Sequence, residues 1–450
     1  MKNEIAPIAL GTNKVSSLLM QYAIPAIIAM TASSLYNITD SIFIGHGVGP
    51  LALSGLAITF PLMNLTAAFG TLIGVGASTL LSIRVGQKDY KTANEILGNV
   101  FVLNLIMGLL LSCTMLLLLK PILIFFGASQ DTLPYAYDFM FIILLGNVFT
   151  HMYFGLNALL RSAGSPQKAM MATIYTVLIN LVLNPLFIFG FGWGIKGSAS
   201  ATIISQVIVL CWQLHLFSNK NYFIHWKKGI YKLRKKIVVD ALSIGLAPFL
   251  MNAAGCIIVV LINQQLIKYG GDLAVGAYGI VNRVAFLFIM VVLGLNQGMQ
   301  PIAGYNYGAK LFNRVHEVLK SSILIATIIM LVGFAIVELF PHTVASMFTT
   351  ESNLIALAVP GLRWVFALYP IVGFQMVAST FFQSIGKPSK AIILSLTRQV
   401  IFLIPLLLIL PNYIKITGVW ASMTISDGLS VVLAFFLLSS ELKKMKVVSE

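Results

Sequence analysis

The sequence is short of charge, and acidic side chains are the scarcest. Among 450 residues, 14 are Asp or Glu and 29 are Lys or Arg, so charged side chains make up 10% of the chain. Soluble domains typically carry about 25%. Hydrophobic residues make up 58%, and the mean hydropathy is +0.92. A water-soluble globular fold is therefore excluded, and we expect most of the chain to lie in lipid.

Cysteine is also scarce, and the common catalytic motifs do not occur. Cys113, Cys211 and Cys256 lie in separate apolar runs without CxxC spacing, which argues against disulfides or a metal site. The sequence has no GxxxxGK[ST], HExxH or GxSxG motif, so nothing points to ATP use or hydrolysis. His151 and His215 are isolated, and we expect them to be packed or water-bonded. We predict that the chain is not an enzyme and needs no cofactor.

Long apolar runs dominate what is present. About 20 apolar residues are needed to cross roughly 30 Å of hydrocarbon as a helix. We expect the first run to be a retained span, since no A-x-A-like cleavage site follows it. The predicted spans are twelve, with approximate limits 15–43, 51–82, 95–119, 134–160, 168–190, 196–218, 238–268, 273–305, 317–341, 354–384, 389–411 and 416–440.

The basic residues predict an orientation. With the N-terminus in the cytoplasm, 22 Lys and Arg residues fall on cytoplasmic segments and only four on outside connections, which is a strong positive-inside bias. Seven of the 22 lie in 219–236, which predicts a basic cytoplasmic linker between an N-terminal lobe, 1–218, and a C-terminal lobe, 237–450. We interpret its charge as fixing topology near anionic lipid and not as binding nucleic acid.

The two halves of the chain repeat each other at a shift of 222 residues. Gly76 matches Gly298, Lys88 matches Lys310, and SAGSPQKA at 162–169 matches SIGKPSKA at 384–391. Because each half holds an even number of spans, the repeat must be parallel, with its axis along the membrane normal. The sequence thus predicts an all-α polytopic membrane protein with twelve transmembrane helices in two six-helix bundles related by a parallel pseudo-twofold repeat.

Asp40 is the only acid well inside a span of the first half. Its repeat counterpart is Asn263, so one bundle alone carries the carboxylate. Counting residues from the span ends places Asp40, Asn184 and Thr202 at a similar depth, about 8 to 9 Å below the outer surface. Asn180 lies one helical turn from Asn184 on the same face.

These residues predict a cation site. Carboxylate, amide and hydroxyl oxygens suit Na⁺, and a carboxylate alone can carry H⁺, so Asp40, Asn180, Asn184 and Thr202 are candidates to hold Na⁺. The alternative is an interfacial carboxylate beside interhelical hydrogen bonds. Pro25 and Pro185 each remove a helical hydrogen bond, which makes each a candidate hinge or a static kink.

Ionisable residues of the second half are expected to be structural. Arg283, Arg398 and Asp427 lie deep enough to need partners, and we predict an ion pair between Asp427 and one of these arginines. Glu338 and Arg363 are expected to reach the outer interface by snorkelling.

Several motifs together resemble the multidrug and toxic compound extrusion (MATE) transporters, and their bacterial multidrug branch most of all. They cover nearly the whole chain: YNITDSIFIGHGVG, LALSGLAITFP, GVGASTLLSIRVGQKD, LRSAGSPQKAM, NLVLNPLFIFGFGWGIKGSASAT and GVWASMTISD.

The resemblance implies a cation site in the N-terminal lobe. It implies roles for Asp40, Asn180 and Thr202, and an Asp at the position where this chain has Asn184. That departure leaves a single carboxylate, so H⁺ and Na⁺ both stay open. Some members carry acids in the seventh and tenth spans. Here Asn252 and Asn263 occupy the seventh span and the tenth has no acid, so no second cation site is expected.

The function expected from this resemblance is secondary active export of cationic or aromatic amphiphilic drugs in exchange for H⁺ or Na⁺. A lipid-linked saccharide flippase of the same superfamily is the alternative, and an ion channel is a third. We expect a monomer in the bacterial inner (cytoplasmic) membrane, multi-pass, with both termini cytoplasmic and no nucleic-acid partner.

Overall fold

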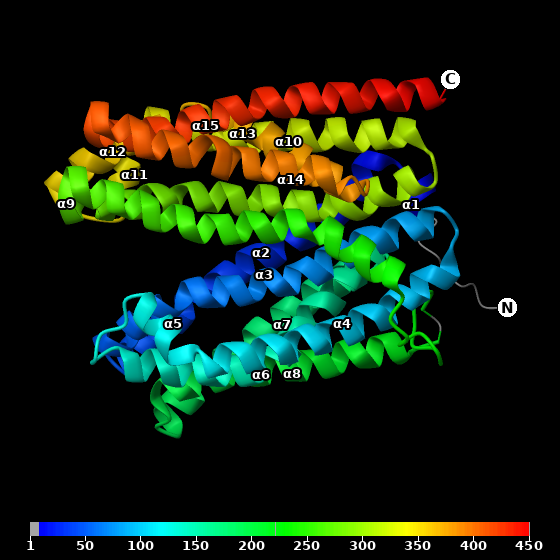
Figure 1. The fold of residues 1–450 in the computed structure, drawn as a ribbon, viewed down its shortest axis with the longest axis horizontal. Helices are drawn as coiled ribbons and strands as arrows, with labels where there is room; N and C mark the ends of the chain where they lie inside the picture. The colour runs from blue at the N-terminus through cyan, green and yellow to red at the C-terminus, as the bar shows by residue number, and fades with distance from the viewer. Residues whose placement is uncertain (1–8, 221, 450) are drawn as a thin grey trace. The chain divides into compact units, whose positions relative to one another are not determined.

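A computed structural model describes residues 9–220 and 222–449, and every regular element in these ranges is a helix (Figure 1). The α-helices are α1 (Ala9–Thr12), α2 (Val15–Gly47), α3 (Pro50–Gly86), α4 (Tyr90–Leu117), α5 (Leu119–Phe125), α6 (Leu133–Ser162), α7 (Pro166–Pro185), α8 (Gly194–Ser218), α9 (Lys235–Gly308), α10 (Phe312–Leu339), α11 (Pro341–Ser346), α12 (Ser352–Phe366), α13 (Tyr369–Ser384), α14 (Pro388–Leu396) and α15 (Ile404–Ser449). Two π-helices, η1 (Leu186–Gly190) and η2 (Thr397–Leu403), follow α7 and α14.

Twelve spans result when the breaks in the long helices are taken into account. In the described ranges, nine stretches are long and apolar enough to cross a membrane, and α12 with α13, bent by 53°, makes a tenth. α9 has a non-helical residue at Gly271, and α15 has two at Ile414 and Lys415. Each of these helices therefore contains two spans, and the predicted twelve-helix fold is confirmed.

The backbone repeats at the shift found in the sequence. α4 and α10 start 222 residues apart and are both 28 residues long. Residues with left-handed backbone conformation also recur at this shift, namely Gly49 (φ 116°) with Gly271 (φ 67°), Lys88 (φ 61°) with Lys310 (φ 59°) and Gly164 (φ 86°) with Gly386 (φ 69°). A non-glycine residue at positive φ is uncommon. The matched lysines show that both halves end the same helix with the same turn.

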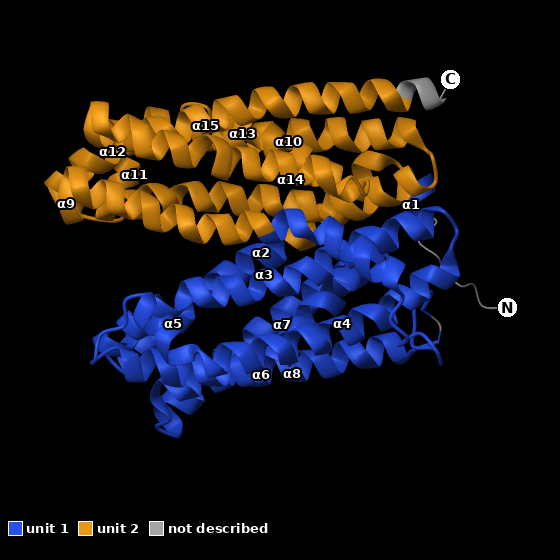
Figure 2. Ribbon diagram, viewed as in Figure 1, with its two compact units in different colours: residues 1–12, 28–249 blue, residues 13–27, 250–450 orange. Residues whose placement is uncertain are grey.

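The chain forms two compact units (Figure 2). Unit 1 comprises residues 1–12 and 28–249, and unit 2 comprises residues 13–27 and 250–450. α2 and α9 each begin in one unit and continue in the other, so the unit limits differ from the predicted lobes 1–218 and 237–450. Those lobe limits stay a prediction.

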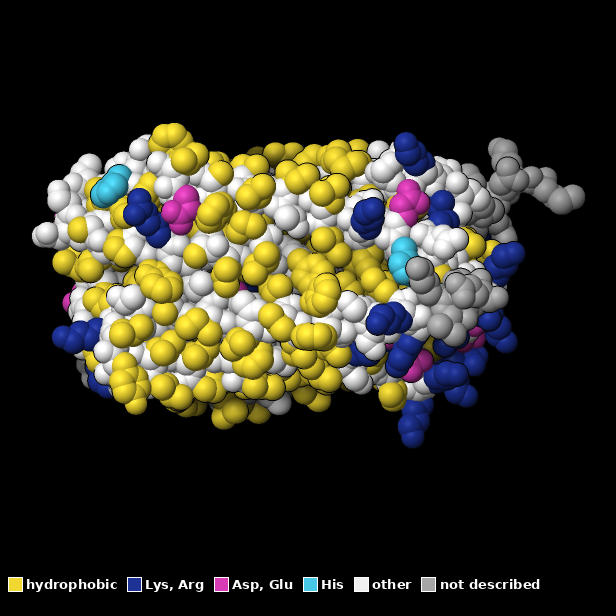
Figure 3. Space-filling view, turned by 90° about the horizontal axis from the view of Figure 1, so that it is seen from above, with side chains coloured by type: hydrophobic (Ala, Val, Ile, Leu, Met, Phe, Trp, Pro, Cys, Tyr) yellow, Lys and Arg dark blue, Asp and Glu magenta, His cyan; other side chains and the backbone are white. Residues whose placement is uncertain are grey.

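The surface separates apolar from basic side chains. In the face shown in Figure 3, hydrophobic side chains cover the middle, and Lys and Arg side chains gather mainly at the end where α10 begins and α15 ends. An apolar band bounded by charge is the pattern that a bilayer imposes on a spanning protein.

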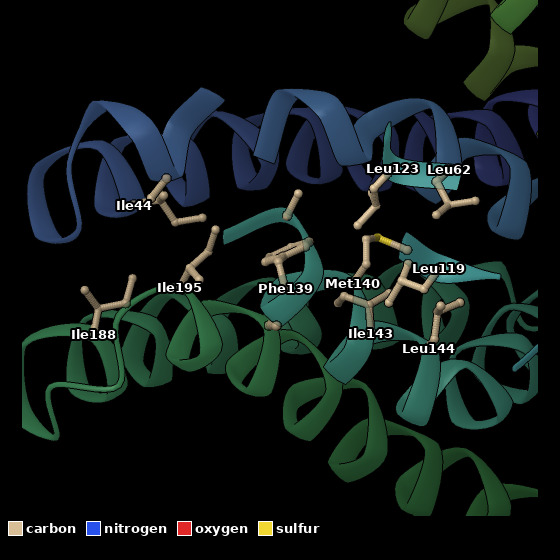
Figure 4. Close-up of a cluster of buried hydrophobic side chains, with 13 residues drawn as sticks. Ile44, Leu62, Leu119, Leu123, Phe139, Met140, Ile143, Leu144, Ile188 and Ile195 are labelled. Carbon is tan, nitrogen blue, oxygen red and sulfur yellow. The ribbon is translucent and has the colours of Figure 1, made fainter. Parts of the chain in front are cut away.

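A hydrophobic cluster fixes the helices of unit 1 around one end of α2 (Figure 4). Ile44 of α2, Ile188 of η1 and Ile195 of α8 are buried together, with Phe139 of α6 beside them. Gly47 allows this approach, because a Cβ there would lie 2.4 Å from the Ile188 side chain. The cluster therefore joins α2, α6, η1 and α8. Polar side chains within four residues of its members along the chain include Asp40, Asn184 and Ser198.

The basic linker is folded against α4 of unit 1. Asn99 donates to the carbonyl oxygens of Ile230 (3.4 Å) and Lys232 (3.2 Å) and accepts from the Arg234 backbone N–H (2.8 Å). The Arg234 guanidinium also pairs with Glu95 at 2.7 Å. These contacts make the described part of the linker an ordered element of unit 1.

Candidate functional site

Asp40 is buried in unit 1 and is held by two neutral side chains. Asn184 of α7 and Ser198 of α8 both donate hydrogen bonds to its Oδ1 atom. Asp40 is 8% exposed, and both donors are fully buried. Both bonds use Oδ1, so neither occupies the second carboxylate oxygen. Three helices thus meet at one acid.

The backbone around Asn184 and Ser198 explains how these two side chains reach Asp40. Pro185 has no N–H to donate to the helix, and the wider π-turn of η1 follows it directly. Such π-turns are frequent at functional sites. Gly197 then lets α8 approach closely, since a Cβ there would lie 2.9 Å from the carbonyl carbon of Phe187.

A second polar layer lies one helical turn away. The Tyr36 hydroxyl and the Thr202 hydroxyl are 2.7 Å apart, and the Asn180 amide donates to Thr202 Oγ1 at 3.3 Å. Each helix contributes to both layers with residues four apart, which share a helix face. The pairs are Tyr36 with Asp40, Asn180 with Asn184, and Ser198 with Thr202.

The structure brings the four predicted residues into one region but divides them between these layers. Asn184 contacts Asp40, whereas Asn180 and Thr202 bond each other. The expected equal depth of Thr202 and Asp40 counted α8 from Lys196, but the helix begins at Gly194. The two-residue difference moves Thr202 by about 3 Å, roughly half a turn. Ser198, which lies one turn before Thr202, takes the place beside Asp40.

Sequence reasoning missed Ser198 and Tyr36. Each lies four residues from a predicted member on the same helix, Ser198 before Thr202 and Tyr36 before Asp40. That spacing was the available signal.

The electrostatics of the site are those of one uncompensated acid. Within residues 9–220 and 222–449, none of the ion pairs involves Asp40. The Asn184 Oδ1 atom is buried and has no hydrogen-bond partner there. Burying an unpaired carboxylate is costly. A proton or a small cation would neutralise Asp40, and Asn184 Oδ1 is an additional acceptor next to it.

The two candidate hinges differ in their surroundings. Pro25 lies inside α2, which is assigned as one helix from Val15 to Gly47. Pro185 ends α7, where the helix changes to η1. A hinge role for either residue stays a prediction.

In unit 2, Asp427 of α15 pairs with Arg398 of η2 at 2.7 Å. Arg283 of α9 is exposed and takes part in none of the ion pairs among the described residues. Glu338 and Arg363 lie 3.9 Å apart. Arg398, which is half-buried, is therefore already neutralised.

Twelve apolar helices in two repeated halves are the architecture of an integral membrane protein of the transporter class. The MatE family model matches residues 25–186 and again residues 244–409. The chain belongs to the MatE family, and each half of the repeat carries one match.

Relatives and solved structures agree over nearly the full length. The multidrug export protein MepA of Staphylococcus haemolyticus (strain JCSC1435) is 27% identical over 429 residues, covering 95% of this chain and 94% of that protein. MepA of Staphylococcus aureus (strain NCTC 8325 / PS 47) is 26% identical over 419 residues, covering 93% and 92%. An outward-facing multidrug resistance MATE family transporter of the MOP superfamily matches with a TM-score of 0.93 at 25% identity, covering 99% of both chains. MATE in the bent conformation matches with a TM-score of 0.94 at 25% identity, covering 99% of this chain and 100% of that one.

Proposed function

We propose that this transporter exports cationic or aromatic amphiphilic compounds in exchange for H⁺, and that Asp40 carries the proton. The multidrug export relatives and the multidrug resistance MATE structure support drugs as the cargo. The choice of H⁺ rests on the buried Asp40 carboxylate, to which, among the described residues, the neutral side chains of Asn184 and Ser198 alone donate hydrogen bonds.

A proton fits this site because it needs only one carboxylate. When Asp40 is charged, Asn184 and Ser198 donate to it; when it is protonated, the acid hydroxyl itself becomes a donor and Asn184 Oδ1 is an acceptor without a partner. Protonation therefore changes which hydrogen bonds α2, α7 and α8 can make. A ligand that prefers one of two arrangements shifts the balance between them, which is how proton and drug become coupled.

Sodium is the second candidate. Asn184 Oδ1 and Ser198 Oγ add two oxygens to the carboxylate, and Na⁺ favours oxygen ligands. The absence of a second acid argues for weaker Na⁺ binding, because Asn184 supplies no charge.

The test is drug uptake into inverted membrane vesicles with pH and Na⁺ gradients imposed separately. We expect uptake of a fluorescent cationic dye with the pH gradient alone and no uptake in Asp40→Asn. The Asn184→Asp variant, which adds the second acid, is expected to gain stimulation by Na⁺. Uptake driven only by Na⁺ in the wild type would show that the proton assignment is wrong.

We further propose a monomer in the cytoplasmic membrane with both termini in the cytoplasm. The bias of 22 to four basic residues supports this orientation. A lipid-linked saccharide flippase is not favoured. The matched relatives are multidrug export proteins, and Arg398, a half-buried cation that such a cargo could use, is already bound to Asp427.

A further inference from the structure

A continuous groove runs along unit 2 between α10, α13 and α15. One part, about 410 Å³, lies between α13 and α15 and includes Ile371, Val432 and Phe436. A second part, about 360 Å³, lies toward α10. Phe374 and Phe435 line both parts, so the two adjoin. The combined volume is in the range of sites for small organic ligands.

The groove changes character along its length. Every residue that lines the first part is hydrophobic, and Phe435 and Phe436 remain 58% and 66% exposed. The second part includes His316, Lys320 and Ser439. These polar residues lie near the start of α10 and the end of α15, the basic end of the unit in Figure 3. A groove that is apolar in one part and cationic in the other matches an anionic amphiphile.

Lys320 is the basic side chain available in the second part of the groove. Lys387 and Lys390 both bind the buried Glu441, the second at 2.6 Å. Lys320 is exposed and makes no ion pair within the described ranges, even though Glu317 is three residues before it. Its long side chain can lie along the apolar wall while its ammonium group reaches the interface.

His316 and Ser439 add hydrogen-bonding groups beside Lys320. The His316 Nδ1 atom is 2.9 Å from the Phe312 carbonyl oxygen. A carbonyl oxygen can only accept, so Nδ1 carries the hydrogen and Nε2 is left for another partner. Ser439 supplies a hydroxyl that can donate to a phosphate or an ester oxygen.

We propose that this groove binds one anionic phospholipid of the surrounding membrane. Its phosphate lies at Lys320, with His316 and Ser439 on the headgroup and glycerol oxygens, and one acyl chain follows Phe374 and Phe435 into the apolar part. Ordinary boundary lipid explains an exposed apolar face but not a preference for headgroup charge, and Lys320 supplies that preference. The site is separate from Asp40 and independent of the transport cycle proposed above.

The experiment uses the full-length protein, purified in a neutral detergent and titrated with phosphatidylglycerol or phosphatidylcholine. Bound lipid is counted by native mass spectrometry, and the melting temperature is followed in parallel. We expect one retained phosphatidylglycerol and a rise in melting temperature that phosphatidylcholine does not produce. Lys320→Gln should raise the half-saturating phosphatidylglycerol concentration about fivefold, the effect of one basic residue at an anionic surface.

Two further variants separate the parts of the site. Val432→Trp fills the apolar part and should abolish the retained lipid with Lys320 in place. Lys444→Gln removes an exposed charge of the same basic end that does not line the groove, and it should behave as wild type. Equal effects of phosphatidylcholine, or an unchanged titration in Lys320→Gln, would show that only boundary lipid covers this face. Lys320 is exposed, so this last variant decides the matter even if Val432→Trp fails to fold.

Discussion

The two units share a backbone plan but differ in what they bury. At the positions 222 or 223 residues after the polar layers of unit 1, unit 2 has mostly apolar side chains, with Trp420 for Ser198, Leu406 for Asn184, Phe402 for Asn180, Asn263 for Asp40 and Thr424 for Thr202. Trp420 is 2% exposed and packs its ring against Gly361. One copy of the repeat keeps a polar interior, and the other fills the same place with an aromatic ring.

Asp40 of unit 1 and Asp427 of unit 2 also have different partners. Asp427 in unit 2 meets the guanidinium of Arg398, whereas Asp40 in unit 1 meets an amide and a hydroxyl. A buried ion pair is neutral as a whole, so binding another cation there would leave excess charge. The acid with neutral partners has no charge beside it that would oppose a bound cation, so we propose an exchange site in unit 1 alone.

The largest expected effect comes from making unit 1 resemble unit 2. Asp40→Asn copies the residue found at Asn263 and removes the only charge of the site. We expect dye efflux from intact cells to fall to the level of cells without the transporter, with unchanged protein in the membrane. Asp138→Asn, at an exposed ion pair with Lys196, is the matched control and should retain efflux. Full efflux in Asp40→Asn would contradict the role given to that acid.

Breaking the ion pair of unit 2 tests the opposite side of the comparison. Asp427→Asn leaves Arg398 without its partner, and we expect a loss of about 2 to 4 kcal/mol in the free energy of unfolding. Thermal unfolding in detergent measures it. The double variant Asp427→Asn/Arg398→Gln should recover most of the loss, because no charge remains unpaired. If the double variant exports no dye although it folds, the pair has more than a structural role.

Removing one donor of Asp40 should have a smaller effect. Ser198→Ala deletes a hydrogen bond to a charged group, worth about 1.5 kcal/mol, so we expect initial efflux rates to fall about tenfold. Ser200→Ala, two residues further along α8, is the control and should transport normally. Equal rates for both variants would mean that Asn184 alone positions the carboxylate.

The smallest effect concerns the starts of two equivalent helices. Asp89 caps α4 by accepting from the Thr92 backbone N–H at 3.1 Å, whereas Leu311, at the same place before α10, has no side-chain acceptor. We expect Asp89→Ala to lower the free energy of unfolding by about 1 kcal/mol and Leu311→Asp to raise it by a similar amount. Thermal unfolding of both variants against wild type checks this pair.

The cap should also respond to pH. Slight burial acts to raise the pKa of Asp89, but the Thr92 hydrogen bonds and the nearby Arg84 and Lys91 lower it more, so the net shift is downward. A lowered pKa means that the cap stabilises the fold above the ordinary value of about 4 and loses this effect as pH falls through the folded value. The difference between wild type and Asp89→Ala should therefore shrink below about pH 4.

Much of the fold was predictable, because a bilayer imposes a length and polarity that a sequence must show. The spans, the repeat and the vicinity of Asp40 and Asn184 followed from hydropathy, the 222-residue shift and counting along helices. Ser198 and Tyr36 did not, because hydroxyls in apolar helices are common and usually bond their own backbone. The depth of Thr202 was counted from Lys196, whereas α8 begins at Gly194, a start that hydropathy does not show.

Anchoring of the linker on Asn99 limits how the chain can be divided. Trp226 of the linker also donates from its backbone to Phe217 (2.9 Å) and from its ring to Leu214 (3.2 Å) at the end of α8. Separately expressed halves would have to keep this segment with the first six spans, and an epitope or protease site inserted between 226 and 232 would compete with hydrogen bonds already made. For an inserted label, the last turn of α15 is therefore a better place than the linker.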